Sequence, residues 1–367
     1  MKLATAWIAL SLVWLAGLGA AELKTRNVLL VTIDGLRWQE VFRGADEDYI
    51  NLAGGGISEK VIPRVREVAL AATPEARRQW LMPFFWSVVV SQGQLVGNRD
   101  RGSNVQVSND QWFSYPGYNE LLTGAPDPRI NSNAPIPNPN VSVLEWLDGQ
   151  AGMAGQVVGC ATWQVFPAIL NVDRSHFPLW VSGNRSPLDK ISPELADIQR
   201  WMNDVTSKSY DEHFDAFAYR AALDLIDTHH PRLLYVALGE PDTWAHGRRY
   251  DHYLESTQRC DRFIREIWEK LQSLPQYRGT TTLIVTTDHG RGATPKDWVR
   301  HGYSTPNSNE TWMAVLGPDS PAKGERENSA PIFSAQIAAT VVQFLGYDYV
   351  KAMPRAAAPI ADFFPAR

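Results

Sequence analysis

The stretch that decides the fold class is Asn27-Val-Leu-Leu-Val-Thr-Ile33, which Asp34 follows directly. Its side chains are mostly apolar or β-branched on both faces, a pattern typical of a central strand in a parallel sheet. Four later segments have the same character, namely residues 156–160, 233–238, 281–287 and 311–316. The chain is therefore expected to return several times to one buried sheet.

Segments of helical character lie between these strands. Residues 214–228, 253–274 and about 332–345 carry apolar side chains at the spacing of a single helix stripe. An alternation of strand and helix predicts an α/β/α sandwich with a mostly parallel central sheet.

Composition narrows the class of protein. The 367 residues are 44% hydrophobic and 20% charged, which excludes disordered, collagen-like and disulfide-scaffold chains. The formal net charge of −5 argues against nucleic acid as a partner, because binding to a phosphate backbone needs a basic surface. The sequence leaves open whether Cys160 and Cys260 form a disulfide or remain two separate thiols.

Residues 1–21 are typical of a secretory signal. Lys2 precedes a long uncharged apolar run that ends in the small residues Ala20 and Ala21. We expect cleavage there, a secreted or periplasmic protein, and no membrane attachment afterwards. An uncleaved anchor is the alternative, because the uncharged run approaches the roughly 20 residues that span a bilayer.

The rest of the chain, residues 22–367, is expected to form a single domain with insertions. Residues 99–140 are rich in Asn, Pro, Gly and Ser, which indicates a loop. Residues 163–211 have no clear periodicity and are expected to form a cap.

Acidic and imidazole residues gather where the predicted strands end. Asp34 follows the first strand, and Asp242 and His246 follow the strand at 233–238. Asp288 and His289 follow the strand at 281–287, and a second loop histidine, His301, comes shortly afterwards in the chain. Because the carboxyl ends of parallel strands share one rim, these side chains should meet there.

Three carboxylates crowded together would repel one another, and some would have to bind protons. Divalent cations remove this repulsion. Six Asp and His ligands fit two sites of three protein ligands each, with open positions, as in catalytic zinc sites. Two such ions about 3.5–4 Å apart would stabilise both the attacking and the leaving oxygen of a phosphoryl transfer. We therefore expect two divalent metal ions, with zinc as the expected metal.

A serine stands at the start of a short predicted helix. Pro116 suits the first helical position and Gly124 the stop, which leaves Ser114 beside free backbone N–H groups that favour an anion. The spacing alone is equally compatible with a nucleophile and with a simple helix cap.

The ordered motifs resemble the alkaline phosphatase superfamily over about residues 27–345. The similar motifs are Thr-Ile-Asp-Gly-Leu-Arg, Ser-Tyr-Pro closing in Leu-Thr-Gly, Pro-Asp-x-x-x-His and Thr-Asp-His-Gly, and they are most similar to the nucleotide pyrophosphatase/phosphodiesterase branch. The resemblance implies an alkaline phosphatase-like catalytic domain in which Ser114 attacks phosphorus and forms a phosphoseryl intermediate. It assigns one ion, which also activates Ser114, to Asp34, Asp288 and His289, and the other to Asp242, His246 and His301.

Departures from the patterns of the subfamilies bear on the substrate. Tyr118 stands where formylglycine sulfatases need Arg, so a sulfatase is disfavoured. Gly117 stands where the phosphodiesterase branch usually has Asn, and Asn133 is the best candidate for an amide that holds phosphate, with Asn131 second. Arg37, Arg291 and Lys296 lie near the expected rim, although such side chains more often pair locally or face solvent.

We therefore expect a two-metal hydrolase that acts on small-molecule phosphate esters. The sequence leaves open whether these are monoesters or diesters, and it leaves open the oligomeric state. Two alternatives remain, namely a non-catalytic metal- or phosphate-binding member of the same fold and a hydrolase of sulfate or phosphonate esters.

Overall fold

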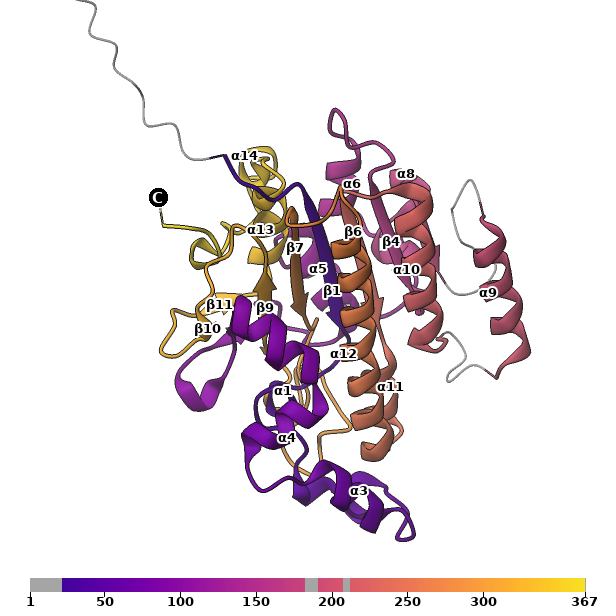
Figure 1. The fold of residues 1–367 in the computed structure, drawn as a ribbon, viewed down its shortest axis with the longest axis vertical. Coiled ribbons are helices and arrows are strands. Elements are labelled where there is room, and N and C mark those ends of the chain that lie inside the picture. Colours follow the sequence, from indigo (N-terminus) through magenta and orange to yellow (C-terminus); the bar gives the residue numbers. More distant parts are fainter. Residues whose placement is uncertain (1–21, 182–190, 207–211, 367) are drawn as a thin grey trace, which may run out of the picture.

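The structure is a computed structural model that describes residues 22–181, 191–206 and 212–366 (Figure 1). The expected signal, residues 1–21, lies outside the described residues, and so does part of the expected cap. In the described part of the chain, no helix is both long and apolar enough to cross a membrane.

An eight-stranded sheet forms the centre of the domain, in the order β10-β2-β9-β7-β1-β6-β4-β5. Its strands are β1 (Asn27–Ile33), β2 (Gln94–Val96), β4 (Val157–Ala161), β5 (Leu179–Val181), β6 (Leu233–Leu238), β7 (Thr281–Thr286), β9 (Met313–Leu316) and β10 (Gly324–Glu325). The first strand, β1, pairs in parallel with both β6 and β7. The expected mostly parallel central sheet is thereby confirmed.

The segment 311–316 differs from its prediction. Only Met313–Leu316 joins the main sheet, and this strand, β9, runs antiparallel to β7. The residues just before it, β8 (Glu310–Thr311), join β3 (Val105–Gln106) and β11 (Ile332–Phe333) in a small second sheet. A strand that follows β7 in parallel would need a crossover connection, usually a helix, that returns the chain to the end of the sheet where β7 begins. The chain between β7 and β9 forms no helix and re-enters the sheet from the rim, so β9 runs in the opposite direction.

Helices cover both faces of the sheet (Figure 1). One face carries α1 (Trp38–Arg43), α3 (Ile62–Ala69), α4 (Pro74–Leu81), the π-helix η2 (Phe85–Val90), α9 (Pro193–Asp204), α10 (Asp215–His229), α11 (Glu240–His246) and α12 (Tyr250–Ser273). The other carries α5 (Ser114–Thr123), α6 (Val143–Asp148), α7 (Phe166–Ile169), α8 (Val172–Ser175), α13 (Gln336–Phe344) and α14 (Tyr349–Ala352). Short helical turns complete the list: α2 (Leu52–Gly55), η1 (Glu47–Tyr49), η3 (Arg99–Arg101) and η4 (Ala361–Phe363).

Alternation along β1 produces the two cores. Leu29, Val31 and Ile33 pack into the cluster under α10 and α12, whereas Val28 and Leu30 pack into the cluster under α5 and α13. Successive strand residues point to opposite faces, so a strand that is apolar throughout must be covered on both sides. This confirms the α/β/α sandwich.

Three details refine the predicted elements. The described part of 163–211 contains β5, which ends the main sheet, and α9, which packs on α10. The predicted helix at 332–345 begins only at Gln336, because Ile332 and Phe333 form β11. Cys160 and Cys260 are both buried thiols and do not form a disulfide with each other.

Candidate functional site

Three neighbouring strands deliver the site to one rim of the sheet. In the sheet order β7-β1-β6, the central strand ends directly before Asp34 and its neighbour β7 ends just before Asp288 and His289. The helix that follows β6, α11, carries Asp242 and His246. The last histidine, His301, comes from the loop between β7 and β8. The topology therefore brings together all six residues that were predicted as metal ligands.

One group consists of Asp34, Asp288 and His289, all buried, with possible ligand atoms within 4.8 Å of one another. The Nε2 atom of His289 lies 3.4 Å from Asp34 Oδ1 and 3.5 Å from Asp288 Oδ2. The hydroxyl of Tyr118 donates a 3.0 Å hydrogen bond to the other oxygen of Asp34, Oδ2.

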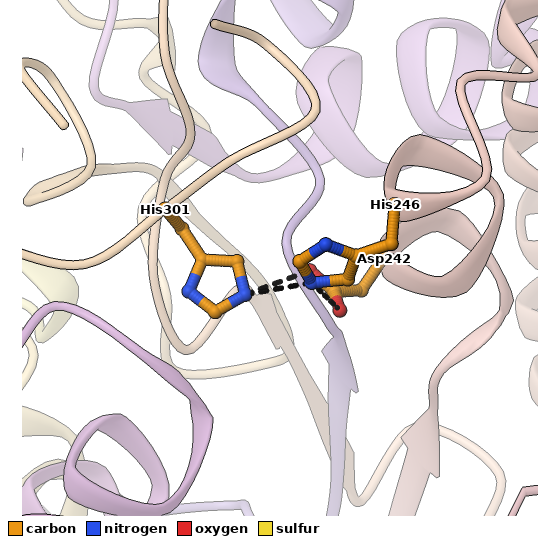
Figure 2. A group of neighbouring side chains, drawn as sticks. All are labelled: Asp242, His246 and His301. Carbon is orange, nitrogen blue, oxygen red and sulfur yellow. Dashed lines mark hydrogen bonds and ion pairs between the residues drawn. The ribbon is translucent and has the colours of Figure 1, made fainter.

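The second group consists of Asp242, His246 and His301. Figure 2 shows the two imidazole rings facing each other with the carboxylate beside them, and their Nε2 atoms are 2.8 Å apart. Asp242 Oδ2 lies 3.1 Å from His246 Nε2, and Oδ1 lies 3.8 Å from His301 Nε2. The two groups adjoin, because Asp242 Oδ1 is 3.9 Å from His289 Nε2.

The charges of this cluster fit a pair of divalent cations. Burial, reinforced by neighbouring carboxylates, raises the pKa of Asp34 and raises that of Asp288 well above its usual value. Among the described residues, Asp34 Oδ1 and Asp288 Oδ2 are buried and accept no hydrogen bond. A buried carboxylate oxygen without a partner is costly unless a cation or donor meets it. Asp and His are ligands that zinc uses, so the residues present suit such an ion.

Burial and neighbouring charges shift the pKa values of Asp242 and His301 in the second triad. Burial opposes ionisation of Asp242, but the Arg291 guanidinium and the His246 and His301 imidazoles together outweigh this effect and lower the pKa of Asp242 well below its usual value. Burial also lowers the pKa of His301 well below its usual value. A neutral imidazole and an ionised carboxylate are the forms that bind a metal.

Ser114 lies beside both triads. It is the first residue of α5, two positions earlier than predicted, because the extended Phe113 is the N-cap. Its Oγ is 3.3 Å from His289 Nε2. A serine that caps a helix occupies the N-cap position, and its side-chain oxygen accepts a hydrogen bond from a backbone N–H two or three residues later. The cap position here belongs to Phe113, and no side-chain cap bond is formed, so this geometry does not support the capping alternative.

Asn133 reaches the same helix end. Its Oδ1 accepts a 2.9 Å hydrogen bond from the backbone N–H of Tyr115. Because Oδ1 is engaged in this way, Nδ2 remains as the donor of this amide. Its expected role in holding phosphate stays a prediction.

A cavity of about 300 Å³ opens over these residues. Beyond the predicted residues it is lined by Tyr118, Thr162, Trp163, Phe166, Glu212, Ala237, Leu238, Gly239 and Thr243. Neither Lys nor Arg is among these lining residues of the described chain. The Thr243 hydroxyl donates to the Glu212 carboxylate, so the cavity wall combines aromatic surface with an acidic group.

The basic residues near the rim do not line the cavity. Arg37 is buried and pairs with Glu40 while it donates to the carbonyl of Gly292. Arg291 is buried against Asp242, and Lys296 is exposed. None of the three lines the cavity.

Sequence reasoning missed Tyr118 and Glu212 as parts of the site. Tyr118 follows Ser114 by four residues on one helix, so the two share a face, and this spacing could have predicted the contact. Glu212 directly follows the stretch without periodicity at 163–211, and no signal in the sequence pointed to it.

A sequence model of the family described as type I phosphodiesterase / nucleotide pyrophosphatase matches residues 96–325. This chain belongs to that family. The match includes Ser114 and every predicted ligand except Asp34, which precedes it. The phosphodiesterase/pyrophosphatase family places the protein among the hydrolases of the alkaline phosphatase superfamily, so the resemblance that the motifs suggested is confirmed.

Solved structures share the fold at low identity. Wild-type alkaline phosphatase PafA superposes with a TM-score of 0.60 at 11% identity, over 94% of this chain and 99% of that one. Ps i-CgsB gives 0.55 at 15% identity, over 93% and 76% of the two chains. Murine ectonucleotide pyrophosphatase/phosphodiesterase 5, in an inactive form with AMP, gives 0.50 at 12% identity, over 88% and 96%. No curated protein matches.

Proposed function

We propose that this protein hydrolyses phosphodiester or pyrophosphate bonds of small molecules, with Ser114 as the nucleophile and two divalent cations, expected to be zinc, as cofactors. The observation that carries the proposal is the position of Ser114 Oγ at the start of α5, 3.3 Å from His289 Nε2 and in the cavity that residues of both carboxylate–imidazole triads line.

The charge of the cavity favours diesters over monoesters. A phosphomonoester carries up to two negative charges on its phosphoryl group, and recognition of the second usually needs a Lys or Arg. Among the described residues the cavity lining has neither, and it contains Glu212. A diester carries one charge and a second organic group, which the aromatic surface of Trp163 and Phe166 can contact.

Each residue has a defined part in the proposed reaction. Asp34, Asp288 and His289 would hold one cation and Asp242, His246 and His301 the other. Bound there, the cations would supply the positive charge that neutralises the carboxylates and lowers the pKa of the Ser114 hydroxyl.

Ser114 Oγ then forms a bond to phosphorus while the bond to the leaving oxygen breaks on the opposite side. At the start of α5 the Tyr115 N–H is already bonded to Asn133 and Pro116 has no N–H, so the backbone N–H of Ser114 and Asn133 Nδ2 would donate to the phosphoryl oxygens. Water subsequently adds to phosphorus and breaks the phosphoserine bond, which regenerates the hydroxyl.

The alternatives from the sequence have less support. A formylglycine sulfatase would need an Arg where Tyr118 binds Asp34. A purely binding module has no reason to retain both triads and the serine together. Export through residues 1–21 remains part of the proposal, and the N-terminal sequence of the mature protein tests it.

The decisive experiment compares an aryl phosphodiester, an aryl phosphate and an aryl sulfate with the zinc-loaded protein. We expect the diester to be the best substrate. Ser114→Ala should lower kcat by at least about a thousandfold, as loss of a nucleophile does elsewhere, with zinc content unchanged. Ser175→Ala, a serine outside the cavity lining, is the matched control and should keep full activity.

Three other outcomes would each overturn one part of the proposed function. Full activity of Ser114→Ala excludes Ser114 as the nucleophile. Preference for the sulfate or the monoester overturns the substrate class. Bound zinc without turnover of any of the three substrates makes the protein a binding module.

A further inference from the structure

The carboxylate of Glu120 is the centre of a buried network on the nucleophile helix. Glu120 is fully buried on α5 and, within the described chain, forms no ion pair. Instead it accepts from the backbone N–H groups of Ser108 at 2.8 Å and Asn109 at 2.7 Å, and from their side chains at 2.9 and 2.8 Å. The backbone N–H of Ala335, just before α13, adds a contact of 3.2 Å.

This network shapes the turn that leads into Ser114. The side chain of Asn109, held by Glu120, accepts through Oδ1 from the N–H groups of Gln111 and Trp112, both at 3.0 Å. Trp112 has a φ of +54°. A bulky residue in this left-handed conformation is strained and persists only where its surroundings enforce it. The hydrogen bonds to Asn109 hold Trp112 in this conformation, two residues before Ser114.

The same turn is bonded to the loop that carries His301. The carbonyl of Trp112 accepts from the N–H of Gly302 at 2.9 Å, and that of Gln111 accepts from the N–H of Tyr303 at 3.1 Å. These two residues follow His301 directly. A continuous chain of hydrogen bonds therefore runs from Glu120 through Asn109 and Trp112 to the backbone beside His301.

We propose that Glu120 is a positioning residue that fixes Ser114 and His301 relative to each other. Only an ionised carboxylate suits the role, because its two oxygens accept from every donor that faces it. A glutamine of the same size would turn an amide NH2 toward N–H groups and leave several of them unsatisfied. The catalytic consequence of this coupling rests on the proposed function, whereas the coupling itself does not.

The test pairs Glu120→Gln with Asp319→Asn. Asp319 is also a buried carboxylate that accepts from backbone N–H groups, at 3.0 Å from Lys24 and 2.6 Å from Thr25. It lies near the amino end of β1, whereas the site lies at the carboxyl end, so it reports the cost of losing a buried acceptor far from the site. The primary readout is hydrogen exchange of the Gly302 and Tyr303 amides, which needs neither metal nor substrate.

We expect Glu120→Gln to accelerate exchange of both amides by at least about tenfold through local opening, and Asp319→Asn to leave them unchanged. In the zinc-loaded enzyme, Glu120→Gln should lower kcat by at least about tenfold with KM changed less than about threefold, as loss of a transition-state alignment does. Asp319→Asn should keep kcat within about twofold, although both variants melt earlier than the wild type.

Unchanged exchange at Gly302 and Tyr303 in a folded Glu120→Gln protein overturns the proposal, and so does an equal acceleration in both variants. If Glu120→Gln does not fold, Asn109→Ala removes the acceptor for Gln111 and Trp112 while Glu120 remains, and the same exchange readout decides. A wild type that hydrolyses no phosphate ester sinks the proposed function alone, because the exchange result still tests the coupling.

Discussion

Buried carboxylates in this protein fall into two kinds that only their partners distinguish. Glu120 and Asp319 are surrounded by N–H and O–H donors, so their charge is satisfied by the protein itself. Asp34 and Asp288 each keep a buried oxygen that accepts no hydrogen bond from the described residues, although His289 Nε2 lies near both. The second kind is what an ion-binding site requires, because a cation takes the place of the missing donors.

Close packing against the backbone of Asp288 explains why position 117 is a glycine. A Cβ at this position would lie 2.5 Å from the backbone oxygen of Asp288. Such a contact forces the helix or the loop to move, so any larger residue would push α5 away from the triad. The Asn that the phosphodiesterase branch usually carries here does not fit this close packing, and Asn133 enters the cavity from a different loop instead.

Tyr118→Phe tests how much the hydrogen bond from the Tyr118 hydroxyl to Asp34 contributes to the rate of the reaction. The change removes one hydrogen bond to a carboxylate, and we expect kcat to fall by about tenfold, the value of a charge-assisted bond. Tyr235→Phe is the matched control, because this buried tyrosine bonds Thr32 at 3.0 Å and does not line the cavity. Steady-state kinetics of both variants decide, and an equal loss in the control would assign the effect to packing.

Individual elements are held by contacts from distant parts of the chain. The π-helix η2 begins where the carboxylate of Asp261, on α12, accepts from the N–H groups of Phe84 and Phe85 at 2.9 and 2.8 Å. These bonds satisfy amides that a helix start leaves without intrahelical partners. The local sequence of η2 contains no capping side chain, so its start depends on α12.

The Asp261 contact predicts a pH dependence of stability. Burial raises the pKa of Asp261 to about 6, against about 3.9 in an unfolded chain. The folded state therefore binds this proton more tightly, and its contribution to the unfolding free energy is complete below about pH 4 and lost as the pH rises through about 6.

Denaturant unfolding of the wild type and of Asp261→Asn, which cannot titrate, isolates this contribution. We expect the wild type to lose unfolding free energy relative to the variant between pH 4.5 and 7, by about 1–3 kcal/mol. If the unfolding free energy of the wild type, relative to that of Asp261→Asn, stays constant or rises over this pH range, Asp261 is not the group responsible.

The whole molecule arranges the site through the order of its strands. The central position of β1 between β6 and β7 brings the end of β1, at Ile33, next to the ends of β6 and β7, at Leu238 and Thr286, far later in the chain. The two apolar cores on either side hold these strands in place. Ligand binding at the rim is therefore coupled to the stability of the entire sandwich rather than to one local segment.

Zinc should consequently raise the melting temperature of the protein. A ligand at one hundred times its dissociation constant adds about 2.7 kcal/mol to the unfolding free energy, which for a domain of this size means roughly 5 °C. A chelator should reverse the shift. His246→Gln should lose part of it, whereas His229→Gln, a histidine outside both triads, should keep it all. A melting temperature that does not respond to zinc would argue against metal binding.

From its residues alone, this chain specified the layered α/β architecture, because uninterrupted apolar strands alternating with amphipathic helices can be buried only between two helical layers. It also specified that acidic and imidazole residues follow those strands. The family resemblance, rather than the spacing of the residues, implied the grouping of the ligands into two triads. The direction of β9, the place of Glu212 and the network of Glu120 came only with the tertiary structure. These features depend on which distant segments become neighbours, and short-range periodicity carries no record of contacts between residues such as Glu120 and Ala335 or Asp34 and Asp288.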